Sequence, residues 1–230
     1  MKNKLQSFET YRGFAALMIA AVHFNVNSPL STHSLANGLF VHFFFTLSGF
    51  VMYLNYHDKL IDLSSVKKFL KKRFFRLYPL HLLFLIIFLI IEISKYFAQI
   101  KYGLMANNVA FSINNLKTFL GNIFLIQTFF DYNTFNTPSW SISAEYYTYM
   151  IFALVFLFMK KNNLFIFISL VAILTFRINS EIGLGIEKTY LSFLDCVYCF
   201  FIGVFSCKLY FKYSYLEIYK KIVFFHEKEN

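Results

Sequence analysis

Charged residues, cysteine, proline and glycine are all scarce in this chain of 230 residues. It contains three Cys, three Pro and eight Gly, and only 15% of its residues are charged. Three cysteines cannot form a disulfide framework, and so few glycines and prolines exclude a collagen-like or low-complexity chain. Soluble domains carry about 25% charged residues, so the low charge argues against a soluble globular domain.

Apolar and aromatic residues are frequent in the chain. Hydrophobic residues make up 58% of the chain and aromatic residues 22%, with 33 Phe and 16 Tyr. The mean hydropathy is +0.54. This composition excludes a disordered chain and predicts an all-α fold, a polytopic transmembrane helical bundle in which residues 1–230 form a single membrane domain.

Six apolar runs predict membrane spans, since a crossing takes about 17–25 mostly apolar residues. They are Tyr11–Asn27, Gly38–Tyr56, Pro79–Phe97, Ser139–Met159, Leu164–Arg177 and Tyr190–Tyr210. The run Leu164–Arg177 is short, so it is tilted or partial. A further run, Leu116–Phe130, predicts a re-entrant or interfacial segment that is buried against protein.

The net charge of +10 indicates orientation rather than a nucleic-acid partner. When the N-terminus is placed in the cytoplasm, most Lys and Arg residues fall on the cytoplasmic side, as the positive-inside rule requires. The N-terminus is therefore expected inside, and the number of crossings is expected to be even. A full crossing by Leu116–Phe130 would invert everything that follows it.

Two ionisable residues interrupt the first apolar run. Arg12 and His23 are eleven residues apart, which is about three helical turns, so they share one face about 16 Å apart. Ionisable groups inside a span are costly and point to function. The plain alternative is a snorkelling arginine and a hydrogen-bonded core histidine.

The segment 64–78 predicts an amphipathic helix with basic residues of two kinds. Its four lysines lie opposite the apolar stripe and suit contacts with anionic lipid, while Arg73 and Arg76 lie on or beside that stripe. Arginines turned toward the protein suit bidentate binding of phosphate. The alternative is that their stems pack and their heads reach the lipid headgroups.

A polar stripe runs along the start of the span after Pro138. Ser141, Glu145 and Thr148 have the spacing i, i+4, i+7, and Trp140 stands where an interfacial aromatic belongs. Glu145 either orients a histidine or holds an acceptor hydroxyl, or it simply pairs with a basic neighbour.

Small residues in the Phe-rich segment 43–50 predict close helix packing. Ser48 and Gly49 allow such an approach, and packing is favoured over catalysis for them. His42, at the outer end of the same span, is a rival general base. Cys196, Cys199 and Cys207 are expected to be small buried hydrophobes, and no metal site is predicted.

Four of these motifs, in this order, resemble membrane acyltransferase family 3. They are Arg12-Gly13 to His23, the Phe-rich segment 43–50, RFFRLYP over 73–79, and WSISAE over 140–145. The resemblance covers about residues 5–150. Members of this family are integral-membrane O-acyltransferases, mostly acetyltransferases, of lipopolysaccharide, peptidoglycan or other polysaccharides.

The resemblance implies a mechanism and a location in the inner (plasma) membrane. The donor substrate is acyl-CoA, mainly acetyl-CoA, which approaches from the cytoplasm, where Arg73, Arg76 and Arg12 bind its phosphates. His23 acts as a general base or relays the acyl group, and Glu145 supports the histidine or the acceptor. The candidate substrate-binding residues are Trp140, Ser141 and Ser48. The expected partners are the lipid bilayer, acyl-CoA and an envelope glycan acceptor.

The chain also departs from the family pattern. Members have about ten spans against about six here, and His42 stands where relatives often carry an acidic residue. We expect a chain that is truncated at its C-terminus or that needs another subunit. The alternatives are therefore an inactive fragment or membrane interaction partner, and a small-solute transporter that uses Arg12, His23 and Glu145 as a polar path.

Overall fold

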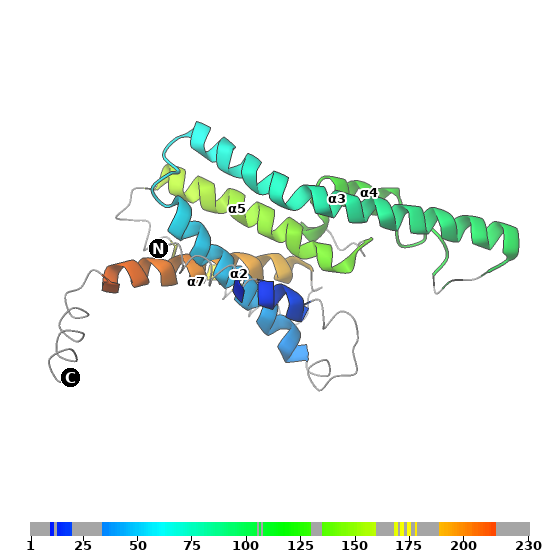
Figure 1. Cartoon of the computed structure of the whole chain (residues 1–230), viewed down its shortest axis with the longest axis horizontal. Helices are drawn as coiled ribbons and strands as arrows, with labels where there is room; N and C mark the ends of the chain where they lie inside the picture. Colours follow the sequence, from blue (N-terminus) through cyan, green and yellow to red (C-terminus); the bar gives the residue numbers. More distant parts are fainter. Residues whose placement is uncertain are drawn as a thin grey trace. The chain divides into compact units, whose positions relative to one another are not determined.

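The computed structural model describes residues 10–11, 13–19, 34–104, 106, 108–129, 135–159, 168–169, 171–172, 174–175, 178 and 189–214. Its elements are α2 (Ser34–Tyr56), α3 (Leu63–Tyr102), α4 (Leu116–Ile123), the 3₁₀ helices η1 (Gln127–Phe129) and η2 (Thr137–Ser139), α5 (Trp140–Phe158) and α7 (Thr189–Ser214) (Figure 1). No strand occurs in these ranges, which confirms the all-α prediction.

Within the described residues, four helical segments are long and apolar enough to cross a membrane. They are Leu39–Tyr56, Leu63–Tyr102, Thr137–Phe158 and Ser192–Tyr213, and they coincide with four of the six predicted spans. The other two predictions, Tyr11–Asn27 and Leu164–Arg177, lie largely outside the described residues. Residues 13–19 of the first of these are helical.

Helix α3 joins two predicted elements into one. Its 40 residues correspond to a length of about 60 Å, twice the hydrocarbon thickness of about 30 Å. The basic segment 64–78 and the apolar run from Pro79 are therefore one continuous helix. Pro79 removes one backbone donor but does not end the helix, a tolerance that is common in membrane helices.

Both ends of α3 are capped. The Asp62 carboxylate accepts a hydrogen bond of 2.7 Å from Ser65 N, and Ser65 Oγ accepts one of 3.2 Å from Asp62 N. This reciprocal pair is a capping box, and the bond from Ser65 N lowers the pKa of Asp62. Gly103 follows the last turn with φ of 61°, where a side chain would be strained.

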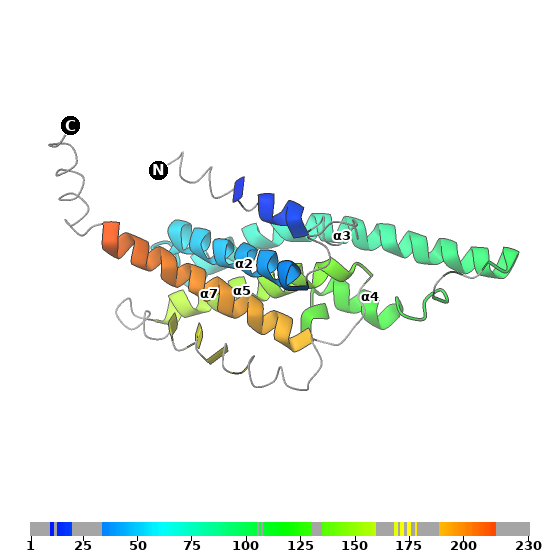
Figure 2. The ribbon, with the colours of Figure 1, turned by 90° about the horizontal axis from the view of Figure 1, so that it is seen from below.

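One compact unit consists of residues 60–159 and 175–197. In it α3 packs along α5, and α4 and the two 3₁₀ helices pack against these two long helices (Figure 2). Val66, Phe69 and Leu85 of α3 are buried, as are Tyr149 and Phe152 of α5.

Helix α4 does not cross the bilayer. Its eight residues span about 12 Å, less than half of the hydrocarbon thickness. Asn115 caps it, and the chain then turns through Leu125, whose φ is 55°, into η1. One face of this segment is buried against α3 and α5. This agrees with the predicted re-entrant or interfacial segment.

The other unit consists of residues 1–59, 160–174 and 198–230, and in it α2 crosses the second half of α7 at two glycines. A Cβ on Gly49 would lie 1.8 Å from Phe200 O, and one on Gly203 would lie 1.9 Å from Thr46 O. The predicted close helix packing is therefore confirmed. The three cysteines are buried thiols outside any disulfide, as predicted.

Candidate active site

The strongest cluster of predicted site residues lies where the first half of α3 packs on α5. The buried positions Val66, Phe69 and Arg73 recur every three or four residues on α3, so they face α5 as one stripe. On α5, Glu145, Thr148 and Tyr149 are buried. Two predicted functional residues, Arg73 and Glu145, therefore lie on the facing helices of one interface.

Arg73 is turned into the protein, as predicted. Only 8% of it is exposed, and its guanidinium carbon lies 5.6 Å from the ring centre of Phe69 and 5.8 Å from that of Tyr149. Such cation–π contacts contribute about 2 kcal/mol when the cation is desolvated. The two rings fix the guanidinium on the side of α3 that faces α5.

Glu145 is 4% exposed, and the hydroxyl of Tyr149, one turn further along α5, donates a hydrogen bond to its carboxylate. A hydrogen-bond donor of this kind offsets part of the cost of removing the carboxylate oxygens from water. Tyr149 contacts Glu145 through its hydroxyl and Arg73 through its ring. The sequence analysis missed this tyrosine, whose i, i+4 spacing from Glu145 was a usable signal.

The prediction for Arg76 is wrong in one respect. Arg76 is exposed, as are Lys67, Lys68, Lys71 and Lys72, so only one of the two arginines turns inward. The buried positions of α3 continue from Arg73 to His81 and Leu85 at spacings of four or eight residues. A step of four residues rotates the buried face by about 40° around the helix axis. The rotation is away from the side of α3 that carries Arg76.

The start of α5 carries the candidate substrate-binding residues Trp140 and Ser141, and both are half-buried. Ser141 Oγ donates to Pro138 O over 2.9 Å, a bond within the first turn. Thr148, the last member of the polar stripe, donates to Ala144 O over 2.8 Å. The substrate-binding role of Trp140 and Ser141 stays a prediction.

Ser48 belongs to the unit that holds α2, and it is fully buried. Its neighbour Gly49 makes the backbone contact with α7, so packing accounts for the small residues at this place. The substrate-binding role of Ser48 also stays a prediction. Arg12 and His23 lie outside the described residues, and so does their expected shared face.

The structure shows a second polar region that the sequence analysis missed. His81 is 4% exposed, and its Nε2 lies 3.0 Å from Asn122 O. Because a carbonyl oxygen only accepts, Nε2 carries a hydrogen. Glu92, further along α3, is 5% exposed. Both are ionisable residues within an apolar run. The rule that such residues point to function, which was applied to Arg12 and His23, would have found them as well.

Metal ligands do not gather in the described part of the chain. No group of three or more His, Cys, Asp or Glu side chains lies there in a geometry that could hold a metal ion.

Comparisons with known proteins agree with the motifs and helices described above. A family model described as an acyltransferase domain matches residues 5–225. The chain belongs to acyltransferase family 3. The match extends beyond residue 150, where the motifs end. Together with the four apolar helices, it makes the chain a multi-pass membrane protein.

Among curated proteins, acyltransferase MdmB of Streptomyces mycarofaciens is 30% identical over 167 residues. The alignment covers 69% of this chain and 41% of that protein, so the chain spans about two fifths of the length of this curated relative. No solved structure matches the chain.

Proposed function

We propose that this protein is an O-acyltransferase of the inner (plasma) membrane. It transfers an acyl group, in the first place acetyl, from cytoplasmic acyl-CoA to a hydroxyl of a cell-envelope carbohydrate such as lipopolysaccharide, peptidoglycan or an exopolysaccharide. Membership of family 3 and the name of the curated relative support acyl transfer.

The observation that carries the donor side is the burial of Arg73 between two aromatic rings. Arg73 lies in the basic half of α3, which the positive-inside rule places at the cytoplasmic side. A guanidinium held in one orientation presents a fixed fork to phosphate oxygens. The exposed Arg76 and the neighbouring lysines add positive charge that attracts the anionic CoA.

The transfer itself is a substitution at the thioester carbonyl. The acceptor oxygen forms the new ester bond, the carbon–sulfur bond breaks, and CoA leaves as its thiol. In the family mechanism His23 takes the hydroxyl proton or relays the acyl group, because imidazole titrates near neutral pH. Glu145, held by Tyr149, supports the histidine or the acceptor.

A comparison of O-acetylation tests the reaction. Membranes that contain the wild-type chain and the His23→Ala variant are given radiolabelled acetyl-CoA, and label in the envelope glycan is measured. General base catalysis contributes about 10²–10⁴-fold, so we expect the variant to lose at least about 100-fold. Equal labelling by both chains contradicts the role of His23.

The donor site is tested by substitutions that keep the charge. Arg73→Lys and the double variant with Arg76→Lys remove the guanidinium fork. We expect acetyl-CoA affinity to fall about tenfold for Arg73→Lys, because lysine lacks the bidentate geometry. Arg76→Lys alone should have a smaller effect, since Arg76 is exposed. Lys72→Arg, which keeps the charge of an exposed side chain, is the matched control. Unchanged affinity in the double variant would mean that these arginines contact only lipid headgroups.

A second candidate function is a membrane interaction partner without turnover. In that case the wild-type chain binds acetyl-CoA, or another ligand expected from the family, but transfers no label to the glycan. The His23→Ala variant then gives the same labelling as the wild type.

A further inference from the structure

The second half of α3 forms one wall of a cavity with a volume of about 300 Å³. The segment 108–115 lies along α3 there, and Thr137 of η2 completes the lining. The lining residues are Glu92, Lys95, Asn108, Val109, Ile113, Asn114 and Thr137. Five of these seven have polar side chains. All seven belong to the unit that contains α3, α4 and α5.

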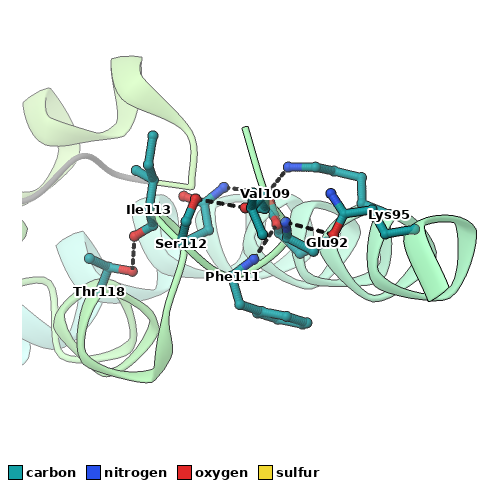
Figure 3. A network of polar contacts seen from close by, with 10 residues as sticks. Glu92, Lys95, Val109, Phe111, Ser112, Ile113 and Thr118 are labelled. Atoms are coloured by element: carbon teal, nitrogen blue, oxygen red, sulfur yellow. Dashed lines mark hydrogen bonds and ion pairs between the residues drawn. The ribbon is translucent and has the colours of Figure 1, made fainter. Parts of the chain in front are cut away.

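Glu92 is the fixed point of this cavity. Its Oε1 accepts a hydrogen bond of 2.9 Å from Lys95 Nζ and one of 2.8 Å from Asn114 Nδ2, and its Oε2 accepts one of 3.1 Å from Phe111 N (Figure 3). Phe111 has φ of 61°, a conformation that costs a non-glycine residue about 1–3 kcal/mol. The bond to Glu92 stabilises it.

The amide of Asn114 is oriented by that carboxylate. A carboxylate only accepts, so the Asn114 group that points to Glu92 must be the NH₂. Asn114 Oδ1 is then the other end of the amide. It is buried and has no hydrogen-bond donor among the described residues. A buried acceptor without a donor costs about 1–3 kcal/mol. Oδ1 has no surface that a ligand could reach, so a ligand meets the cavity through the polar lining residues taken together.

The balance of charge in the cavity selects the kind of ligand. Glu92 and Lys95 form an ion pair of 2.9 Å, so the lining has no net charge. Amide, hydroxyl, ammonium and carboxylate groups together offer both donors and acceptors. A volume of 300 Å³ is at the lower end of small-molecule pockets, which run from about 300 to 1,000 Å³. These properties fit one neutral, hydroxyl-rich ring.

The position along the helices separates this cavity from the donor side. Glu92 is 19 residues beyond Arg73 on α3, a distance of about 28 Å, close to the hydrocarbon thickness of the bilayer. On the other wall, Thr137 of η2 precedes Glu145 of α5 by eight residues, roughly 13 Å at the rises of a 3₁₀ turn and an α-helix. A ligand in the cavity is thus near Glu145, but it does not carry the hydroxyl that reacts there.

We propose that this cavity is an acceptor subsite, which binds a neutral sugar unit next to the unit that is acylated. The assignment rests on the proposed function, because it takes the acceptor to be a carbohydrate. Glu92 and Asn114 are positioning residues in it. They hold the acceptor chain so that a neighbouring hydroxyl reaches the region of Glu145.

Direct sugar binding tests the proposal without any turnover. The full-length protein in detergent is titrated with the methyl glycosides of glucose, galactose and N-acetylglucosamine, and saturation-transfer NMR reports binding. We expect at least one neutral glycoside to bind, and Asn114→Ala to weaken it about tenfold. Glucose 1-phosphate and methyl glucuronide should bind more weakly than the neutral glycoside, because the lining has no net charge.

Val109→Trp and Val109→Ala form a matched pair. The Val109 side chain lines the cavity and is 55% exposed, so tryptophan fills the cavity without removing a bond to Glu92, whereas alanine leaves it open. We expect tryptophan to abolish glycoside binding and alanine to keep it, with equal thermal unfolding of both. Asn55→Ala, at an amide that donates to Val51 O within α2, is the control for Asn114→Ala.

Three results overturn the proposal: no neutral glycoside binds, an anionic sugar binds better than every neutral one, or Val109→Trp binds as tightly as the wild type. Acetyl-CoA binding and glycan labelling are measured on the same preparations. If labelling persists without glycoside binding, the subsite is wrong and the proposed function stands. If glycosides bind but no acyl group is transferred, the proposed function fails and the cavity is a sugar-binding site without an acylated neighbour.

Discussion

At the scale of single residues, the environment decides which of two similar side chains serves the site. Arg73 and Arg76 are three residues apart on one helix, yet only Arg73 is buried. Likewise, of the tyrosines at 146, 147 and 149, only Tyr149 is buried. Its hydroxyl donates a hydrogen bond to Glu145. Position on a packed face, not residue type, makes the difference.

Tyr149→Phe tests the support of Glu145. The substitution keeps the ring beside Arg73 but removes the donor to a buried carboxylate, which costs about 1–3 kcal/mol. We expect the thermal unfolding temperature of the protein in detergent to fall and glycan labelling to decrease.

Tyr102→Phe, at a position that is 66% exposed, is the control and should unfold like the wild type. If Tyr149→Phe leaves both stability and labelling unchanged, the hydroxyl does not hold Glu145 in place.

At the scale of elements, the continuity of α3 and the close packing of α2 on α7 set the distances within each of the two units. One unbroken α3 fixes the spacing between the basic end and the cavity at Glu92. Two glycines bring α2 and α7 close enough for their backbones to touch. Without a strong hydrophobic driving force in lipid, such close van der Waals packing is what holds membrane helices together.

Gly49→Ala should separate α2 from α7. The new Cβ would lie 1.8 Å from Phe200 O, a backbone atom that cannot rotate away. Overpacking costs about 1–3 kcal/mol, and a clash with backbone belongs at the upper end. We expect a lower unfolding temperature and loss of activity, measured by detergent-based thermal denaturation and glycan labelling.

Gly13→Ala is the matched control, because its Cβ meets nothing within 4 Å. Alanine is a better helix former than glycine by about 1 kcal/mol, so this variant should be as stable as the wild type or more stable. Equal loss of stability in both variants would show that the effect is not the contact with α7.

At the scale of the whole molecule, threading through the bilayer gives each end of a helix its chemistry. In the proposed function, the basic start of α3 meets the anionic donor in the cytoplasm, and the cavity at the other end of α3 meets the acceptor outside. The eight-residue α4 keeps this order, because it enters the protein without crossing the membrane. The even number of crossings predicted from the sequence depends on that short helix.

Cysteine labelling tests the threading. In a variant whose three native cysteines are replaced by alanine, Ile61→Cys and Leu104→Cys mark the two ends of α3, both at exposed positions. We expect a membrane-impermeant maleimide to label Leu104→Cys in intact cells, and Ile61→Cys only after permeabilisation. The reverse pattern would place the N-terminus outside and refute the proposed approach of acyl-CoA.

The sequence by itself determined the helical membrane class, four of the described spans, the inward turn of Arg73 and the family. These follow from hydropathy, periodicity and motif order, which are local properties of the chain. Only the tertiary structure decided that Arg76 is exposed, that α3 is continuous through Pro79, that Tyr149 holds Glu145, and that Glu92 and Asn114 line one cavity. The exposure of Arg76 and the cavity at Glu92 depend on which helix packs against which face, and those contacts join residues far apart in the sequence. The bond from Tyr149 to Glu145 and the continuity of α3 are local, but only the folded geometry shows them.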